Sequence, residues 1–237
     1  MPNYSAEAII LSMRDFAEAD KIVTLFSKEK GIIESIAKGA RRPTSRKTPS
    51  IEILNIGKFS LATGRNLHIL LEANISNQIS SGFENEKLNY VFYISEILKN
   101  SLSHSDNSKE IWSNIISLIP YTKDYFFHAL IKLQLAILDE LGMPPSFDFC
   151  AVTEKSLIEN RSQRDGLIGY VVLEKGRIEI SDRILKIQKF IQQKELSKTL
   201  KLQITEGDFN IIFAIQNDWI ETALEREVKS FKLASSG

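Results

Sequence analysis

Short runs in which hydrophobic and polar residues alternate occupy residues 5–73, and this is the pattern of half-buried β-strands. Turn residues separate the runs, among them Lys30-Gly31 and the hairpin signal Gly64-Arg65-Asn66. Five short strands within about seventy residues are typical of a small barrel such as an OB-fold. We therefore predict a five-stranded OB-fold β-barrel over residues 1–80, with strands at 7–13, 21–27, 32–37, 51–61 and 66–73.

From about residue 85 the hydrophobic residues recur every three or four positions, which predicts amphipathic helices. An irregular region at 146–180 contains a β-hairpin pattern at 170–181, and Thr205-Glu206-Gly207-Asp208 resembles a capping box. The predicted fold class is thus α+β, with the barrel followed by a C-terminal helical bundle over 81–237 that carries a small hairpin insertion. The helices are expected at 85–102, 108–119, 122–141, 181–196 and 205–231.

A basic segment follows the third predicted strand and contains no carboxylate between Ala37 and Lys47. Gly39 and Pro43 interrupt regular structure, so a loop is expected there. Concentrated Lys and Arg beside a strand edge suit a polyphosphate backbone, because each neutralised phosphate releases counterions. Composition alone supports equally well a second interpretation, in which this is a solvent-exposed loop whose charges only keep it soluble. The candidate nucleic-acid-binding residues are Lys38, Arg41, Arg42, Arg46 and Lys47.

Aromatic residues that could stack on bases are scarce in the predicted barrel, with Phe59 and His68 as the nearest candidates. Backbone electrostatics should therefore outweigh base stacking, and sequence preference should be weak.

Charge is distributed unevenly although the formal net charge is zero. Residues 1–80 hold eleven Lys and Arg against eight acids, a balance of +3, so the remainder carries −3. A polyanion would therefore meet the first domain. The single Cys150 cannot form an internal disulfide, and no signal peptide or membrane span is apparent, so we expect a cytoplasmic protein.

Residue patterns typical of enzymes and metal sites are missing from the sequence. His68, His104 and His128 are scattered, and one cysteine cannot supply a thiolate-rich zinc site. Nucleophile-elbow, Walker A and Rossmann glycine patterns are absent, and no carboxylates are paired for acid–base work. We predict no catalytic residues, no metal and no cofactor.

Two further charged stretches favour structural interpretations. The turn from Arg14 to Lys21 mixes both signs and is expected to be an ion-paired strand connection. A second basic run is expected to be a solvated helix face, with a second nucleic-acid surface as the open alternative. Its cations are Arg183, Lys186, Lys189, Lys194, Lys198 and Lys201.

An ordered series of motifs in the first fifty residues resembles the bacterial recombination mediator family RecO. The motifs are Glu7-Ala8-Ile9-Ile10-Leu11, then Arg14-Asp15-Phe16-x-Glu18-x-Asp20-Lys21-Ile22-Val23, then Gly31 and Ala37-Lys38-Gly39-Ala40-Arg41-Arg42-Pro43-x-Ser45-Arg46. The resemblance continues more weakly through 133–144 and reappears at 225–231.

The resemblance implies an N-terminal OB domain and a helical C-terminal domain. It implies binding of single- and double-stranded DNA, annealing of strands coated with single-stranded DNA-binding protein, and loading of RecA at gaps together with RecR and often RecF. It also implies that the helical domain binds the acidic tail of the single-stranded DNA-binding protein. By position, the implied DNA contacts are Lys38, Arg41, Arg42 and Arg46, and Lys47 joins them on charge alone.

One departure from the family concerns zinc. Many relatives have a four-cysteine module after the proline turn, whereas here Cys150 stands alone and Thr153 occupies the place of a Cys-x-x-Cys partner. We therefore expect apolar packing of the hairpin to hold region 146–180.

Two other functions fit the same residues. The missing zinc module and the neutral charge are compatible with a protein–protein adaptor that binds DNA feebly, and an OB-fold could also bind RNA.

Overall fold

A computed structural model places the chain in two compact units, Met1–Ile119 with Val228–Gly237 and Pro120–Glu227. The predicted domain boundary at residue 80 lies outside the described residues. The structure describes residues 2–43, 45, 50–78, 87–102, 108–118, 121, 124–148, 169–173 and 176–235.

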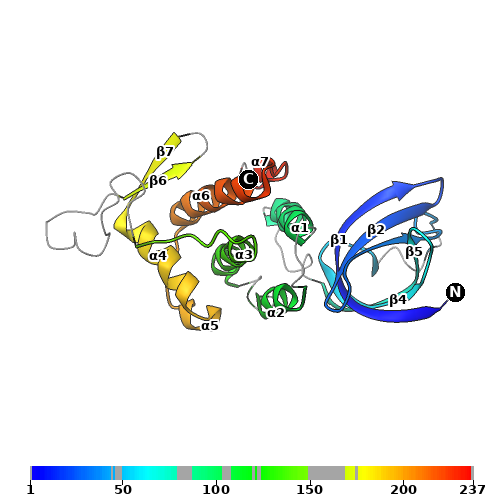
Figure 1. The fold of residues 1–237 in the computed structure, drawn as a ribbon. Coiled ribbons are helices and arrows are strands. Elements are labelled where there is room, and N and C mark those ends of the chain that lie inside the picture. Colours follow the sequence, from blue (N-terminus) through cyan, green and yellow to red (C-terminus); the bar gives the residue numbers. More distant parts are fainter. Residues whose placement is uncertain are drawn as a thin grey trace, which may run out of the picture. The chain divides into compact units, whose positions relative to one another are not determined.

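The first unit contains a closed five-stranded barrel with the strand order β1-β2-β3-β5-β4 (Figure 1). All neighbouring strands are antiparallel except β3 and β5, which pair in parallel where Ser35 faces His68. The predicted OB-fold barrel is therefore confirmed. The strands are β1 Asn3–Phe16, β2 Asp20–Ser27, β3 Gly31–Ala37, β4 Asn55–Ala62 and β5 His68–Gln78.

The barrel interior is filled by alternate residues of each strand, as the period of two requires. Val23 and Leu25 of β2 meet Phe59 and Leu61 of β4 in this core. The other face of β2 is buried as well, because Phe26 packs against Trp112 with ring centroids 5.9 Å apart. Burial on both faces explains why β2 has apolar residues on both sides, Val23 and Leu25 on one and Ile22 and Phe26 on the other.

Glycine is required at two crowded points of the barrel. At Gly57 a Cβ would lie 2.2 Å from the Asn74 carbonyl oxygen, next to an irregularity in the β4–β5 ladder. At Gly64, in the predicted hairpin, a Cβ would lie 1.8 Å from the Leu67 carbonyl oxygen. Both positions let two backbones approach more closely than any side chain would allow.

Three helices complete the first unit: α1 Leu88–Leu102, α2 Ser108–Leu118 and α7 Phe231–Ala234. Ser95 of α1 donates a hydrogen bond to the Leu11 carbonyl of β1. Glu96 accepts hydrogen bonds from the Lys229 and Ser230 backbone N–H groups and from the Ser230 hydroxyl. These contacts bring the C-terminal segment back onto α1.

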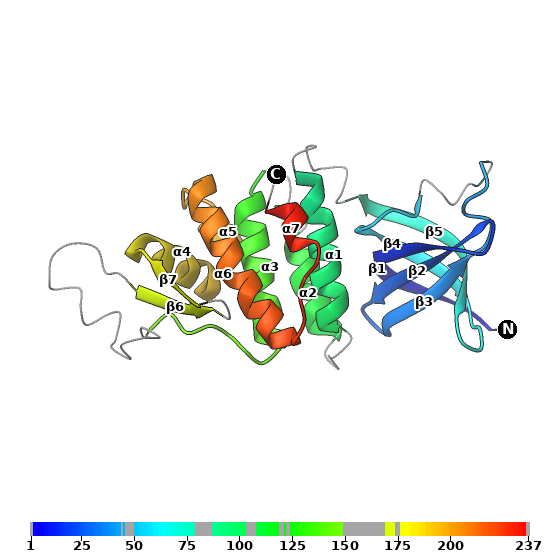
Figure 2. The ribbon, with the colours of Figure 1, turned by 90° about the horizontal axis from the view of Figure 1, so that it is seen from above.

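The second unit is helical, and α3 and α6 lie side by side in it (Figure 2). Phe127 of α3 stacks on Phe209 of α6 with centroids 4.3 Å apart. The predicted hairpin is present as an antiparallel pair and the predicted capping box at Thr205 is confirmed. The elements are α3 Phe126–Glu140, β6 Gly169–Leu173, β7 Gly176–Ile180, α4 Asp182–Gln193, α5 Leu196–Thr199 and α6 Glu206–Leu224.

Several predicted boundaries are wrong. The strand expected over 51–61 begins at Asn55, and the helix expected over 122–141 begins at Phe126. The helix expected over 181–196 ends at Gln193, and a separate turn of helix begins at Leu196. The helix expected over 205–231 ends at Leu224, because Glu225 adopts a left-handed conformation (φ 51°) and its N–H closes the last turn. No helix of the described ranges is long and apolar enough to cross a membrane.

Candidate nucleic-acid interface

The basic segment leaves the barrel at the end of β3, where the β1–β2 turn lies beside it. Lys38, Arg41 and Arg42 are exposed. Gly39 has a φ of 67°, a conformation that glycine adopts without strain and that turns the chain away from β3. The three described candidates thus share one short exposed turn. Arg46 and Lys47 lie outside the described residues.

Backbone hydrogen bonds attach this segment to the β1–β2 turn. The Gly39 N–H donates to Oδ1 of Asp20 over 2.8 Å, and the Arg41 N–H donates to the Ala19 carbonyl over 2.9 Å. The Arg42 N–H donates to the Gly39 carbonyl over 3.1 Å and closes the turn. The segment is therefore held at its first residues.

The side chain of Arg41 is also engaged by the turn. Its Nε lies 3.3 Å from Oδ2 of Asp15, and Nη1 donates to the Ala17 carbonyl over 3.3 Å. Lys21 approaches the same carboxylate at 3.9 Å. The arginine is 39% exposed, so solvent screens the pair and its contribution to stability is small. These contacts orient the guanidinium while leaving it open to a phosphate.

The role of the β1–β2 turn was only partly predictable from sequence. An ion-paired connection was expected, and the Asp15 pairs confirm it. The sequence did not indicate that Asp20 would hold Gly39, nineteen positions away. A carboxylate at the start of a strand carries no signal about which later N–H it will meet.

The two stacking candidates differ in the structure. Phe59 is fully buried in the barrel core, so its prediction as a base-stacking residue is wrong. The alternation of β4 places it on the inner face with Leu61. His68 is half-buried, and its Nδ1 lies 3.1 Å from the Tyr4 hydroxyl.

The second basic run is largely compensated by carboxylates. Arg183 forms a 2.8 Å ion pair with Asp208, and the lysines of α4 and α5 pair with Asp182, Asp148 and Glu195. The lysines concerned are Lys186, Lys189 and Lys198. This arrangement favours the interpretation as a solvated helix face.

A surface pocket of about 630 Å³ opens on α4 within this run. Ile187, Phe190 and Leu202 give it an apolar lining, and Arg183, Lys186 and Lys189 stand around it. Phe190 is 39% exposed, so part of this apolar lining is open to solvent.

Within the described ranges, no group of three or more His, Cys, Asp or Glu could hold a metal ion. Cys150, Thr153 and His104 lie outside those ranges. The region 146–180, where many relatives have the zinc module and where apolar packing is expected instead, is described only at 146–148, 169–173 and 176–180.

Comparison with known proteins agrees with this architecture. The model for the N-terminal domain of recombination protein O matches residues 1–79, and the model for its C-terminal domain matches residues 83–232. The chain belongs to the RecO family. Members of this family are DNA repair proteins by name.

Three RecO relatives cover almost the whole chain at low identity. DNA repair protein RecO of Desulforamulus reducens is 24% identical, with 97% of this chain and 93% of the relative aligned. The RecO protein of Pelotomaculum thermopropionicum is 25% identical, with 98% of this chain and 93% of the relative aligned. The RecO protein of Clostridium perfringens is 25% identical, with 95% of this chain and 94% of the relative aligned. The RecO resemblance predicted from the first fifty residues is therefore confirmed along the full chain.

Proposed function

We propose that this protein is a non-enzymatic recombination mediator that binds single- and double-stranded DNA and promotes annealing of complementary strands. In this role it helps to load RecA at gaps coated with single-stranded DNA-binding protein, and it works at the nucleoid. Membership of a DNA repair family and an OB-fold barrel support the proposal.

The observation that carries the proposal is the exposed basic turn fixed to the barrel end. Lys38, Arg41 and Arg42 present positive charge from a backbone that Asp20 and Ala19 hold in place. Phosphate contacts of this kind bind any sequence, because they do not touch base edges. Two strands repel each other through their phosphates, and cations between them lower that repulsion so that pairing can begin.

The proposed partners are RecR and the acidic tail of the single-stranded DNA-binding protein, and through them the protein would assemble indirectly with RecF and RecA. The pocket on α4 supports the acidic tail as a ligand of the second unit. Its apolar lining would take a hydrophobic side chain, and Lys186, which is 57% exposed, can exchange Asp182 for a carboxylate of the peptide.

A strand-annealing assay tests the proposed function. The wild-type protein is expected to accelerate annealing of bare complementary oligonucleotides and of strands coated with single-stranded DNA-binding protein. Arg41→Glu with Arg42→Glu should slow annealing of bare strands about tenfold or more, since two phosphate contacts become repulsive. Lys198→Glu with Lys201→Glu, an equal charge change on exposed lysines of the second unit, is the matched control.

The same assay distinguishes the mediator from the alternative, a protein–protein adaptor that binds DNA feebly. The Arg41–Asp15 ion pair favours the adaptor, because Asp15 offsets the charge of one cation of the basic segment. An adaptor would leave bare strands unaffected and act only on coated ones. Absence of annealing of bare strands by the wild-type protein would therefore contradict the mediator function.

A further inference from the structure

The barrel end opposite the basic segment carries a second group of aromatic and cationic side chains. This end of the barrel contains the start of β1, the β2–β3 turn, the β4–β5 hairpin and the start of β5. The basic segment and the β1–β2 turn lie at the other end, because β1 and β3 both run away from this one. The eight residues of β2 separate the two ends by about 25 Å.

Contacts between three elements organise this group. Lys30 Nζ, in the β2–β3 turn, lies over the Tyr4 ring at 4.8 Å from its centroid. The Tyr4 ring meets His68 edge-on with centroids 5.4 Å apart, and the two side chains share a 3.1 Å hydrogen bond. Burial raises the pKa of the Tyr4 hydroxyl, so it stays neutral. Both rings are half-buried, and the Tyr4 ring also packs against the barrel core, so they are held in fixed positions at the rim of the barrel.

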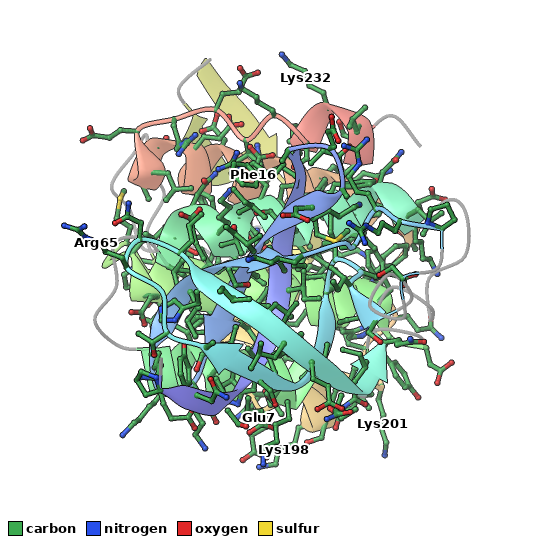
Figure 3. The ribbon with its side chains drawn as sticks, turned by 90° about the vertical axis from the view of Figure 1, so that its right-hand side faces the viewer. Glu7, Phe16, Arg65, Lys198, Lys201 and Lys232 are labelled. Carbon is green, nitrogen blue, oxygen red and sulfur yellow. The ribbon has the colours of Figure 1, made fainter. Side chains whose placement is uncertain are left out.

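Arg65 adds a charge at the same end. It is exposed in the β4–β5 hairpin, and Figure 3 shows it extending away from the barrel and well apart from Phe16 at the end of β1. The β2–β3 turn holds Lys28 and Lys30 against one carboxylate, Glu29. With Arg65 the turn and the hairpin together carry a positive charge.

The wall between the two ends is unsuited to a polyanion. OB-folds commonly bind oligonucleotides along the face of strands 2 and 3. Here Trp112 covers Phe26 on that face, and the exposed residue between Ile33 and Ser35 is the acidic Glu34. A strand bound at the basic segment would not continue along this wall to Tyr4.

We propose that Tyr4, Lys30, Arg65 and His68 form a second binding site for single-stranded polynucleotide, independent of the basic segment. The Tyr4 and His68 rings would stack on bases, while Lys30 and Arg65 would contact phosphates. At about 25 Å the two sites lie beyond the Debye length of about 8 Å in physiological salt, so strands held at both hardly repel each other. One chain could then hold two strands for annealing, which deepens the proposed function and rests on it.

Binding stoichiometry with the eight-nucleotide (dT)8 at about 0.15 M salt, where the Debye length stays well below the separation of the sites, tests the inference. Titration calorimetry of the full chain should give two oligonucleotides per wild-type chain and one per chain for Lys30→Glu with Arg65→Glu. The control is Lys58→Glu with Lys109→Glu, an equal charge change elsewhere on the first unit, and it should still bind two oligonucleotides per chain. All four substituted cations are exposed, and circular dichroism checks that both variants fold.

Stacking is tested separately at Tyr4. Tyr4→Phe keeps the ring and should retain both sites, whereas Tyr4→Ala should weaken the second site about tenfold or more. The inference would be overturned if the wild-type chain bound only one oligonucleotide, or if the Lys30→Glu with Arg65→Glu variant still bound two. Arg41→Glu with Arg42→Glu should also bind one; if it still binds two, the basic segment fails as an interface while the second site stands.

Discussion

Asp208 shows how a single residue can hold several parts of the second unit together. Its carboxylate accepts hydrogen bonds from Arg183 Nε and Nη2 and from the Thr205 hydroxyl and N–H. The Thr205 hydroxyl in turn accepts from the Asp208 N–H, which completes the capping box of α6. The hydrogen bond from Arg183 is the main cause of a carboxyl pKa lowered to about 2, while partial burial opposes the shift.

This lowered pKa predicts a pH dependence of stability. Because the folded state favours the carboxylate, the stabilisation is complete above the unfolded pKa of about 4 and is lost as the pH falls towards 2. Asp208→Asn should therefore cost at most about 2 kcal/mol of unfolding free energy at pH 7, and the difference from wild type should shrink towards pH 2.

Urea unfolding between pH 7 and pH 2.5 measures this difference. Asp182→Asn, which removes the partner of exposed Lys186, is the control and should change stability by less than about 1 kcal/mol at every pH. A difference between wild type and Asp208→Asn that stays constant down to pH 2.5 would show that the Arg183 pair does not set the pKa.

At the scale of elements, α4 depends on a lysine from another helix to close its C-terminus. The last turn of α4 contains no basic residue. Lys132 of α3 instead donates to the carbonyls of Ile191, Gln192 and Lys194 at 2.9–3.0 Å. Burial lowers the pKa of this lysine, with Asp139 opposing the shift. A half-buried ammonium is tolerated there because it satisfies the carbonyls that every helix end leaves unpaired.

We expect Lys132→Met to destabilise the protein by about 1–3 kcal/mol, because the aliphatic stem remains while the carbonyls of Ile191 and Gln192, which are partly buried, lose their donor. The chemical-denaturation midpoint measures the change. Lys198→Met, which removes only the exposed pair with Glu195, should cost less than about 1 kcal/mol. Equal losses for the two variants would refute the capping role of Lys132.

Element prediction from sequence succeeded where one local signal sufficed. Alternation gave the five strands, and Thr205 with Asp208 gave the start of α6. It failed where tertiary contacts decide: the end of α6 depends on the left-handed Glu225, and the segment after it returns to α1 because Glu96 accepts its N–H groups. Neither event has a signature in the local sequence.

At the scale of the whole molecule, the sequence indicated the fold class and the family but not how the candidate site is built. The basic residues were recognisable from charge alone. Their support by Asp20 and Ala19, and the pairing of Arg41 with Asp15, arise from strands that meet only in the closed barrel. The burial of Phe59 follows from strand parity, which an irregular ladder obscures in the sequence.

The central claim is that the basic segment holds polynucleotide through its phosphates, and the salt dependence of binding tests it most directly. Fluorescence anisotropy with a labelled single strand across a salt series gives the slope of log affinity against log salt. Arg41→Glu with Arg42→Glu should lower affinity and make that slope shallower by about 1.4, or about 0.7 for each lost phosphate contact. A slope and affinity equal to those of the wild-type protein would contradict the account.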